Sequence, residues 1–311
     1  TQTGSTKADL LAHSMGGLVA RNYISDSSRA SNVRKLFTLG TPHLGSVNFL
    51  KNLIYGGCLT RPGLEGLSYC SGIDNSEVKD VLQNMISGYE LAPTQEYFNF
   101  YDGQDKDHLY PYQKDGQSLN YNQIKSFLTN TGHNTSLFGP SEIFHALDTN
   151  LPNTNGVEII NIAGSGRPTL GQIREKSIKD FFGNTVQEKD GFTINGDQTV
   201  PLLSASLIDY SRGKILLGDA KVFYTKQEHG ALVASGPALS LVKNILDSDS
   251  QLPDGVSNQP YSFSGTQVSI HSPVNIHAYD TSGNHTGPTA DGDFEANIPG
   301  SSYDTLDDAK F

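Results

Sequence analysis

One segment sets the architecture of this chain: Lys7-Ala8-Asp9-Leu10-Leu11-Ala12-His13-Ser14-Met15-Gly16-Gly17-Leu18-Val19-Ala20-Arg21. Residues 8–12 form a short apolar run, which predicts a buried strand of a parallel sheet. After Ser14 the apolar residues recur at helical spacing, so a helix is expected to follow at once. A strand that turns into a helix this abruptly needs small residues at the corner, and Ala12, Gly16 and Gly17 fulfil that need.

The corner is close to the nucleophile-elbow pattern G-x-S-x-G, in which a serine hydroxyl is exposed at the end of a strand. Ala12 replaces the first glycine, and we expect it to add the crowding of one methyl group. A serine between glycines is common by chance. The flanking strand and helix favour a catalytic Ser14, provided that partner residues follow in the right order.

Composition excludes several classes of protein. The chain has 311 residues, enough for one large α/β domain and a small appendage. Its net charge of -11, with no basic run, argues against a nucleic-acid partner and against a polybasic membrane anchor. No apolar segment approaches the roughly 20 residues that span a bilayer, so we expect no integral membrane segment. No cofactor fingerprint or metal-ligand spacing occurs, so we expect neither a cofactor nor a metal.

A second strand is predicted at Val33-Arg34-Lys35-Leu36-Phe37-Thr38-Leu39, directly before Gly40-Thr41-Pro42-His43-Leu44-Gly45-Ser46. Strand, helix and strand within forty residues indicate a βαβ unit and a parallel sheet. Ligands bind at the carboxyl ends of such strands, so Ser14 and the loop should lie side by side. His43 is a candidate for lining the site, although its glycine-flanked loop could equally be turn chemistry.

Between residues 47 and 155 the periodicity breaks down. Short helical segments at 76–87 and 121–128 alternate with aromatic-rich loops at 97–101 and 110–112. A long insertion of this kind inside a compact domain is typical of a cap or lid. Its aromatic residues would suit an apolar substrate, or would pack the small core of the cap itself.

The sheet resumes at residues 157–163, and a loop then leads to Asn195-Gly196-Asp197-Gln198-Thr199-Val200-Pro201. A glycine-flanked turn can fix the backbone of Asp197 and point its carboxylate inward. After a last strand at 221–225 come Glu228-His229-Gly230 and a helix over 231–246. The order Ser14, Asp197, His229 is that of the α/β-hydrolases.

Together, the segments around residues 12–17, 40–46, 196–201 and 228–230 resemble an α/β-hydrolase lipase. The most similar branch contains the lecithin:cholesterol acyltransferases and related bacterial lipases, and Tyr89-Glu90-Leu91-Ala92-Pro93-Thr94 resembles one of its cap segments. The resemblance covers residue 7 to about residue 246. It implies that Asp197 is the acid of a catalytic triad, although Gln198 replaces the middle glycine of the family's G-D-G-T-V-P loop.

The expected function is therefore a serine hydrolase of carboxylic esters, a lipase or esterase that acts on acyl lipids. Ser14, His229 and Asp197 would form the triad and an acyl-enzyme, and the Met15 N–H would be one oxyanion donor. We expect the substrate to be lined by His13, His43 and Leu44. Three alternatives stay open: a lipid O-acyltransferase with the same triad, a peptidase or thioesterase, and an inert hydrolase-like protein that binds a surface.

The predicted fold is an α/β-hydrolase fold, with a mostly parallel sheet of which only the C-terminal part is present. We expect this domain at residues 1–247 with its cap insertion at about 47–155, and a linker at 248–262. Alternating strands at 268–270, 274–278 and 294–298 predict a partial β-sandwich module over residues 263–311. This module would bind a cell surface or another domain.

Only thirteen residues precede Ser14, whereas a hydrolase sheet normally begins with several earlier strands. We therefore expect an internal fragment of a longer protein. The second oxyanion donor would come from outside the chain, and losing one donor slows turnover by about 10²–10³. Cys58 and Cys70 would close a disulfide loop worth about 3 kcal/mol, or stay free. Abundant Gly, Ser, Asn, Thr and Tyr favour a secreted or cell-surface bacterial protein.

Overall fold

A computed structural model describes residues 4–57, 60–62, 67–70, 75–100, 109–146, 154–209, 214–215, 220–271, 274–290, 294–306 and 309–311. Its contacts divide the chain into two compact units. Unit 1 comprises Thr1–Ser46, Pro140–Thr169 and Asn195–Ser264, and unit 2 comprises Val47–Gly139, Leu170–Ile194 and Gly265–Phe311. The C-terminal residues thus group with most of the insertion, which differs from the predicted boundaries. A separately folding C-terminal module stays a prediction.

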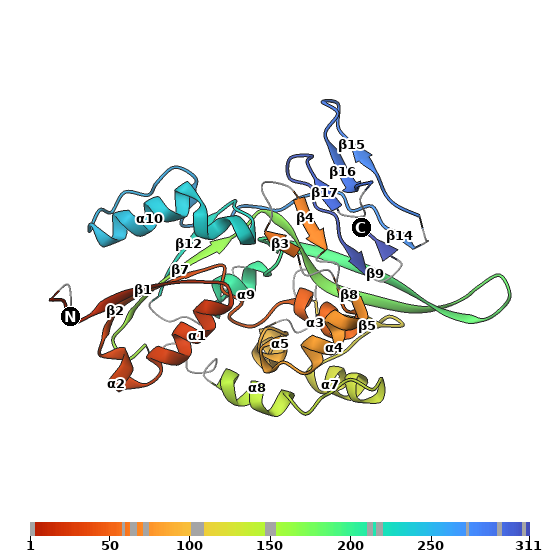
Figure 1. Ribbon diagram of the computed structural model, residues 1–311, viewed down its shortest axis with the longest axis horizontal. Coiled ribbons are helices and arrows are strands. Elements are labelled where there is room, and N and C mark those ends of the chain that lie inside the picture. Colours follow the sequence, from red (N-terminus) through yellow and green to blue (C-terminus); the bar gives the residue numbers. More distant parts are fainter. Residues whose placement is uncertain are drawn as a thin grey trace. The chain divides into compact units, whose positions relative to one another are not determined.

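Unit 1 is built on a five-stranded sheet with the order β1-β2-β7-β12-β13 (Figure 1). Its first four strands pair in parallel, and the short fifth strand pairs antiparallel to β12. The strands are β1 (Ala8–His13), β2 (Val33–Leu39), β7 (Glu158–Gly164), β12 (Lys221–Thr225) and β13 (Val256–Ser257). The four parallel strands lie within a residue of the predicted ones, whereas β13 lies in the segment predicted to be a linker.

Helices cover both faces of this sheet. α1 (Met15–Ile24) and α2 (Ser27–Ala30) pack on one face, and α10 (Gly236–Leu246) packs on the other. Successive side chains of a strand point to opposite faces. Leu36 accordingly belongs to the cluster with Ile24 of α1, and Phe37 belongs to the cluster with Leu241 of α10. The predicted α/β fold with a mostly parallel sheet is confirmed.

Two local predictions in unit 1 are wrong. β1 was expected to be buried, but it is an edge strand whose Leu11 is 48% exposed, because β2 is its only partner among the described strands. The helix expected over 231–246 is interrupted, since a 3₁₀ helix, η2 (His229–Ala234), precedes α10. Ser235 separates the two and caps α10 through its hydroxyl, and Pro237 occupies the first turn.

Unit 2 consists of short helices and small sheets. Its helices are α3 (Val47–Tyr55), α4 (Asn75–Gln83), α5 (Ile86–Glu90), α6 (Gln95–Phe100) and α7 (Tyr121–Asn130), and α8 (Phe138–His145) leads back into unit 1. One sheet has the order β15-β16-β17-β4-β3, a second has β14-β19-β18, and a third has β6-β5-β8-β9. Because β17 pairs with β4, strands of the predicted C-terminal module join a strand of the insertion.

The strands of these small sheets are short, apart from two. They are β3 (Thr60–Pro62), β4 (Leu67–Cys70), β5 (Tyr112–Lys114), β6 (Gln117–Ser118), β8 (Arg167–Lys179), β9 (Thr185–Gly196), β14 (Ile270–His271), β15 (Ala278–Tyr279), β16 (His285–Pro288), β17 (Phe294–Ala296), β18 (Thr305–Leu306) and β19 (Ala309–Lys310). Unit 1 also contains α9 (Leu202–Ser206) and the strand pair β10 (Ile208–Asp209) and β11 (Lys214–Ile215). The side chains of Cys58 and Cys70 lie outside the described part of the structure.

The aromatic residues of the insertion pack into its own core. Residues 97–101 were expected to be a loop, but Gln95–Phe100 form α6, and Tyr97, Phe98 and Phe100 are buried. Phe98 meets Tyr121 of α7 edge-on at 5.5 Å between ring centroids. The structure therefore favours the core-packing alternative for these rings over substrate contact.

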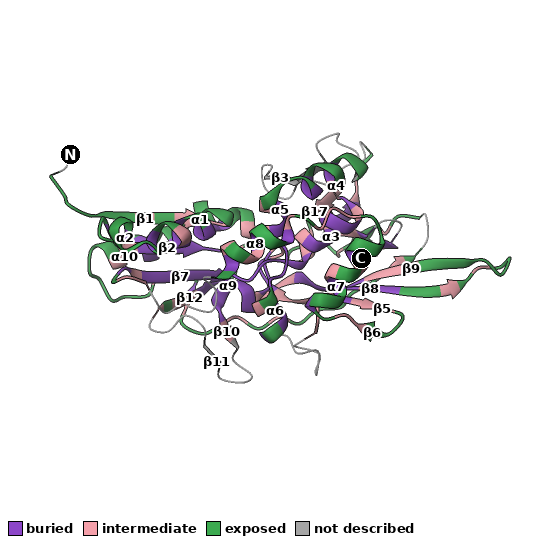
Figure 2. Ribbon diagram, turned by 90° about the horizontal axis from the view of Figure 1, so that it is seen from below, coloured by how far each residue is buried: buried purple, intermediate pink, exposed green. Residues whose placement is uncertain are grey.

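The segment expected to be a loop before Asn195 is a long hairpin. β8 and β9 have 13 and 12 residues, and the outer part of the hairpin is exposed (Figure 2). Among the described residues, no helix has the length and apolar character needed to cross a bilayer.

Candidate active site

Ser14 occupies a strained corner between β1 and α1. Its backbone angles are φ 55° and ψ -132°, a region that L-residues rarely adopt. The Ser14 N–H donates to the carbonyl of Leu39 at 2.9 Å, which continues the β1–β2 pairing up to the corner. Gly17 is required by packing, because a Cβ at this position would lie 1.9 Å from Thr41 Oγ1. This geometry matches the predicted elbow.

Ala12, which replaces the usual first glycine, is not crowded against Gly16. Even a Cβ built on Gly16 would remain 4.0 Å from the Ala12 Cβ, which is ordinary van der Waals contact.

His229 connects the two other residues predicted for catalysis. The Ser14 hydroxyl lies 2.9 Å from His229 Nε2, and His229 Nδ1 lies 2.9 Å from Asp197 Oδ2. The His229 side chain keeps 14% exposure, whereas Asp197 is fully buried. The structure thus brings the three residues together from positions far apart in the sequence. A carboxylate that accepts from Nδ1–H leaves Nε2 free to accept the serine proton.

The turn around Asp197 fixes its carboxylate. Asp197 Oδ1 accepts the backbone N–H groups of Thr199 at 3.0 Å and Val200 at 2.7 Å, while Oδ2 faces His229. The His229 N–H also donates to the Asp197 carbonyl at 2.9 Å. Gln198 has φ 77°, the left-handed conformation that a glycine adopts readily. Gln198 replaces the middle glycine of G-D-G-T-V-P, so a residue with a Cβ adopts the left-handed conformation at this position, and backbone strain is expected there.

Two glycines that the sequence analysis did not assign to the site make room for it. Gly40 has φ 55°, and a Cβ there would meet Leu232 Cδ1 at 2.8 Å, Asp197 Oδ2 at 3.1 Å and His229 Nδ1 at 3.2 Å. At Gly164 a Cβ would lie 2.5 Å from the Asp197 Cβ. Gly40 follows β2 directly and Gly164 ends β7, so glycine at the carboxyl end of a strand was the signal available in the sequence.

His13 contacts the imidazole of His229. Its Nε2 lies 2.8 Å from the His229 carbonyl, and the two rings are 4.9 Å apart between centroids. Burial lowers the pKa of the half-buried His13, so the ring is neutral at pH 7. Because a carbonyl can only accept, Nε2–H is the donor. We infer that His13 holds the segment that carries His229, beyond its predicted role in lining the substrate.

His43 and Leu44 differ from the prediction that they line the site, since both are fully buried. His43 Nδ1 lies 3.0 Å from Nη1 of the buried Arg21. Burial and then the Arg21 charge hold the pKa of His43 well below its usual value. The Leu44 N–H donates to Ser204 Oγ at 3.1 Å. Both residues therefore belong to the core beneath the loop.

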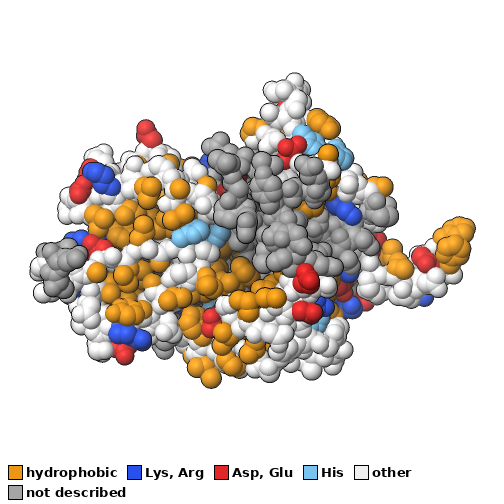
Figure 3. Space-filling view, in the orientation of Figure 1, with side chains coloured by type: hydrophobic (Ala, Val, Ile, Leu, Met, Phe, Trp, Pro, Cys, Tyr) orange, Lys and Arg blue, Asp and Glu red, His pale blue; other side chains and the backbone are white. Residues whose placement is uncertain are grey.

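Apolar side chains are exposed on the elements that carry Ser14 and His229. On α1, Met15 is 40% exposed, Val19 61% and Tyr23 39%. Val233 of η2 and Leu239 of α10 are exposed to similar extents. Figure 3 shows hydrophobic side chains gathered on the face viewed there. Met15, the predicted oxyanion donor, begins α1, so its N–H lies at the positive end of the helix dipole.

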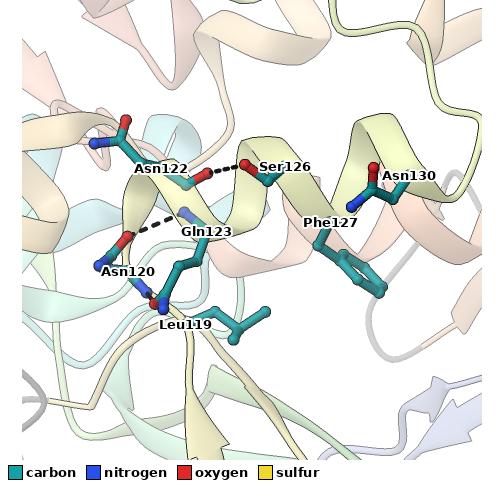
Figure 4. A pocket seen from close by; sticks show the side chains of 7 residues that line it. All are labelled: Leu119, Asn120, Asn122, Gln123, Ser126, Phe127 and Asn130. Atoms are coloured by element: carbon teal, nitrogen blue, oxygen red, sulfur yellow. Dashed lines mark hydrogen bonds between the residues drawn. The ribbon is translucent and has the colours of Figure 1, made fainter.

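Unit 2 contains a hollow of about 450 Å³, whose lining includes none of these residues (Figure 4). It lies beside α7, and its lining side chains are apolar or uncharged polar: Leu119, Asn120, Asn122, Gln123, Ser126, Phe127 and Asn130. Two of these residues, Asn120 and Gln123, form the capping box at the N-terminus of α7. The hollow offers no titratable group for catalysis.

A family of α/β domains matches the N-terminal part of the chain. Residues 1–55 match the family described as the PGAP1-like alpha/beta domain. No curated protein sequence matches the chain. One solved structure similar to it is the Tle4–Tli4 complex, with a TM-score of 0.48, 16% identity and coverage of 78% of this chain and 59% of that one.

Another is the Bacillus licheniformis lipase BlEst2 in its propeptide form. It has a TM-score of 0.37, 15% identity and coverage of 99% of this chain and 57% of that one. The chain thus spans less than three fifths of the length of both solved structures. With 55 of 311 residues matched by the PGAP1-like description, unit 1 is similar to a hydrolase-like α/β domain over its first βαβ unit.

Proposed function

We propose that this protein is a serine hydrolase that cleaves carboxylic esters of acyl lipids through an acyl-enzyme. The observation that carries the proposal is the continuous hydrogen-bonded path from the Ser14 hydroxyl through His229 to the buried Asp197. The strained conformation of Ser14 supports it, because strain at an exposed serine on an elbow is typical of a nucleophile.

The geometry supports a two-step mechanism. His229 Nε2 accepts the Ser14 proton while Oγ attacks the ester carbonyl, and the imidazolium then donates that proton to the leaving alcohol. Water attacks the acyl-enzyme in the second step, with His229 again as the base. Asp197 holds the reactive tautomer and stabilises the imidazolium. The Met15 N–H donates to the oxyanion of each tetrahedral intermediate.

Acyl lipids are proposed as substrates because apolar side chains are exposed on α1, which follows Ser14, and on η2, which begins with His229. An ester with a long acyl chain can remove such side chains from water at about 25 cal/mol per Å² of apolar surface. Short polar esters gain little from this contact. The proposal therefore predicts that the rate rises with acyl-chain length in a series of p-nitrophenyl esters.

Labelling by a fluorophosphonate tests the nucleophile. We expect covalent labelling of the wild-type chain and none of Ser14→Ala, and labelling of His229→Ala should be reduced by orders of magnitude. Equal labelling of Ser14→Ala would contradict the proposed nucleophile. No labelling of folded wild-type chain would favour the inert surface-binding alternative. Transfer of the acyl group to an added lipid alcohol, in place of release to water, would identify an acyltransferase.

We further propose a place among the lecithin:cholesterol acyltransferases and related bacterial lipases, and export to a bacterial cell surface, where the C-terminal strands bind the surface or another domain. The motifs around Ser14, Asp197 and His229 support the first proposal, and the low lysine content supports the second. Cell fractionation of the source organism tests export. Recovery in the cytosol alone would contradict it.

A further inference from the structure

The β8–β9 hairpin ends in a turn that carries two exposed aromatic rings. Phe181 is 97% exposed and Phe182 is 84% exposed, the highest values among the large hydrophobic side chains that the structure describes. Their rings lie edge to face, 5.5 Å apart between centroids. Figure 3 shows hydrophobic side chains at the end of the projecting arm, which is the β8–β9 hairpin in Figure 1.

The turn holds both rings outward by a fixed set of hydrogen bonds. Asp180 Oδ1 accepts the N–H groups of Phe182 at 2.9 Å and Asn184 at 2.8 Å, and the Asp180 N–H donates to the Asn184 carbonyl at 3.0 Å. Gly183 takes the left-handed conformation, with φ 84°. An aspartate that bonds the backbone two and four residues on gives a turn with a defined shape. The rings are therefore presented by an ordered turn.

The shape and size of the tip favour a lipid surface over a protein surface. A stable protein interface needs about 800 Å² from each partner, whereas a Phe ring supplies only about 150–250 Å². A lipid interface, by contrast, accepts a small convex apolar group at any point. The tip is therefore too small for a stable protein contact and large enough to insert into lipid.

The charges next to the rings also fit a lipid surface. Residues 176–187 contain two lysines, Lys176 and Lys179, and one aspartate, on a chain with a net charge of -11. Both lysines are exposed, and the Asp180 carboxylate is occupied by the turn. Lysines that flank exposed aromatics are attracted to anionic headgroups while the rings enter the acyl region.

We propose that the tip of the β8–β9 hairpin binds anionic lipid bilayers by inserting Phe181 and Phe182 at the membrane surface. This inference is independent of the ester chemistry proposed above, since the hairpin contributes no residue to the Ser14–His229–Asp197 site. It adds a means by which the protein can be held at a lipid–water interface.

The chain contains no tryptophan, so a single introduced tryptophan reports its own environment. Phe182→Trp should show a blue-shifted emission, and quenching by lipids with brominated acyl chains, when mixed with phosphatidylglycerol–phosphatidylcholine vesicles. Ile143→Trp is the matched control, because Ile143 is a large hydrophobic residue on α8 that is 78% exposed. Its emission should not change. An unchanged emission of Phe182→Trp, or equal shifts in both variants, overturns the proposal.

Vesicle co-sedimentation measures the contribution of each group. Phe181→Ser/Phe182→Ser should weaken vesicle binding by about 10²- to 10⁴-fold, given the free energy of burying two Phe side chains. Ile143→Ser, at a site 78% exposed on α8, should bind as the wild type does. Lys176→Gln/Lys179→Gln should lower binding to anionic vesicles and remove its salt dependence. Equal melting temperatures establish that the variants are folded.

Three further outcomes overturn the proposal. Binding by the double serine variant equal to that of the wild type excludes insertion of the rings. Unchanged binding of the double glutamine variant to anionic vesicles excludes recognition of anionic lipid. A blue shift of the Phe182→Trp emission that appears without vesicles and grows with protein concentration assigns the tip to contact with a second copy of the chain.

Discussion

Each of the two units buries a carboxylate, and the two carboxylates have different neighbours. In unit 1, Asp197 accepts two backbone N–H groups and a histidine that is still partly exposed. In unit 2, Glu175 is hydrogen-bonded by Tyr55 and by Lys114, the latter at 2.7 Å. Only the first carboxylate is connected through an imidazole to a serine hydroxyl. A buried carboxylate thus indicates catalysis only when its partner can activate a nucleophile.

Tyr55 and Tyr112, the tyrosines beside Glu175, keep their hydroxyl protons and so remain hydrogen-bond donors. Burial raises the pKa of Tyr55 and of Tyr112 well above the usual value, so both phenols stay protonated at all ordinary pH values. Their hydroxyls lie 3.1 Å apart. Burial works to raise the pKa of Glu175, but the hydrogen bonds from Lys114, Tyr55 and Tyr112 outweigh it and lower the pKa. This cluster therefore links β5, β8 and α3 within unit 2, and its members include no histidine, serine or cysteine.

Replacing each carboxylate by its amide tests this comparison with the largest expected effect. Asp197→Asn should lower the rate of ester hydrolysis by about 10⁴ with the fold retained, because an amide favours the wrong tautomer of His229. Glu175→Gln should leave the rate within a factor of two or so and lower the melting temperature, since the partly exposed Lys114 loses the buried carboxylate that it pairs with. Kinetics and thermal melting of both variants measure the two effects. Equal loss of activity in both variants would contradict the division of roles.

Two left-handed glycines provide a second, smaller test. Gly40→Ala places a Cβ against Leu232, Asp197 and His229, so we expect a loss of activity of about 10²-fold from a displaced imidazole. Gly116 in unit 2 has φ 81° and open space around it. Gly116→Ala suffers the same kind of backbone strain and should cost only about 1 kcal/mol of stability, with unchanged activity. Unchanged activity in Gly40→Ala would show that the site tolerates the displacement.

The sequence predicted unit 1 better than unit 2 for a physical reason. β7 is buried along almost its whole length and is a nearly continuous apolar run, and the short motif around Ser14 directly follows the apolar residues of β1. The β8–β9 hairpin has charged residues along both faces, so neither alternation nor an apolar run marked it. The signal that was present is Gly183-Asn184 beside the β-branched Thr185 and Val186, which is typical of a hairpin turn.

Local sequence also cannot tell which polar residue of a loop faces the site. His43 and His13 both lie next to predicted strands, yet His43 is buried against Arg21 and His13 contacts His229. That difference depends on the packing of α1 against the loop, through Gly17 and Thr41. Contacts between residues far apart in sequence decided these positions, and periodicity contains no information on them.

Acid should destabilise the two units at different pH values. Burial and then Arg21 lower the pKa of His43, so below about pH 6.5 the unfolded chain binds a proton that the folded chain does not. The His43 contribution to stability is therefore complete above that pH and is lost as the pH falls below it. The lowered pKa of Glu175 has the corresponding effect below about pH 4.5.

Amide hydrogen exchange as a function of pH distinguishes these two losses. Protection in β2 and β7 should decline from about pH 6.5 downward, and protection in α3 and β8 only below about pH 4.5. Glu175→Gln is the control, because it should flatten the lower step and leave the upper one unchanged. A single common step in both units would contradict independent titration.

The smallest expected effect concerns the left-handed residues of two turns. Gln198, beside Asp197, has φ 77°, and Asp115 in unit 2 has φ 48°. Aspartate adopts this conformation more readily than glutamine does, and the Asp115 carboxylate also accepts the N–H and hydroxyl of Ser177 from the neighbouring strand β8. Gln198→Gly should therefore raise the free energy of unfolding by no more than about 1 kcal/mol. The relief of backbone strain in the folded state stabilises the variant by more than the added entropy of the unfolded chain destabilises it. Asp115→Gly should be neutral or slightly destabilising. Urea unfolding of the two variants measures both free energies of unfolding. A decrease of more than about 1 kcal/mol in Gln198→Gly would contradict the prediction. It would mean that the glutamine side chain, and not only the backbone, shapes the turn that holds Asp197.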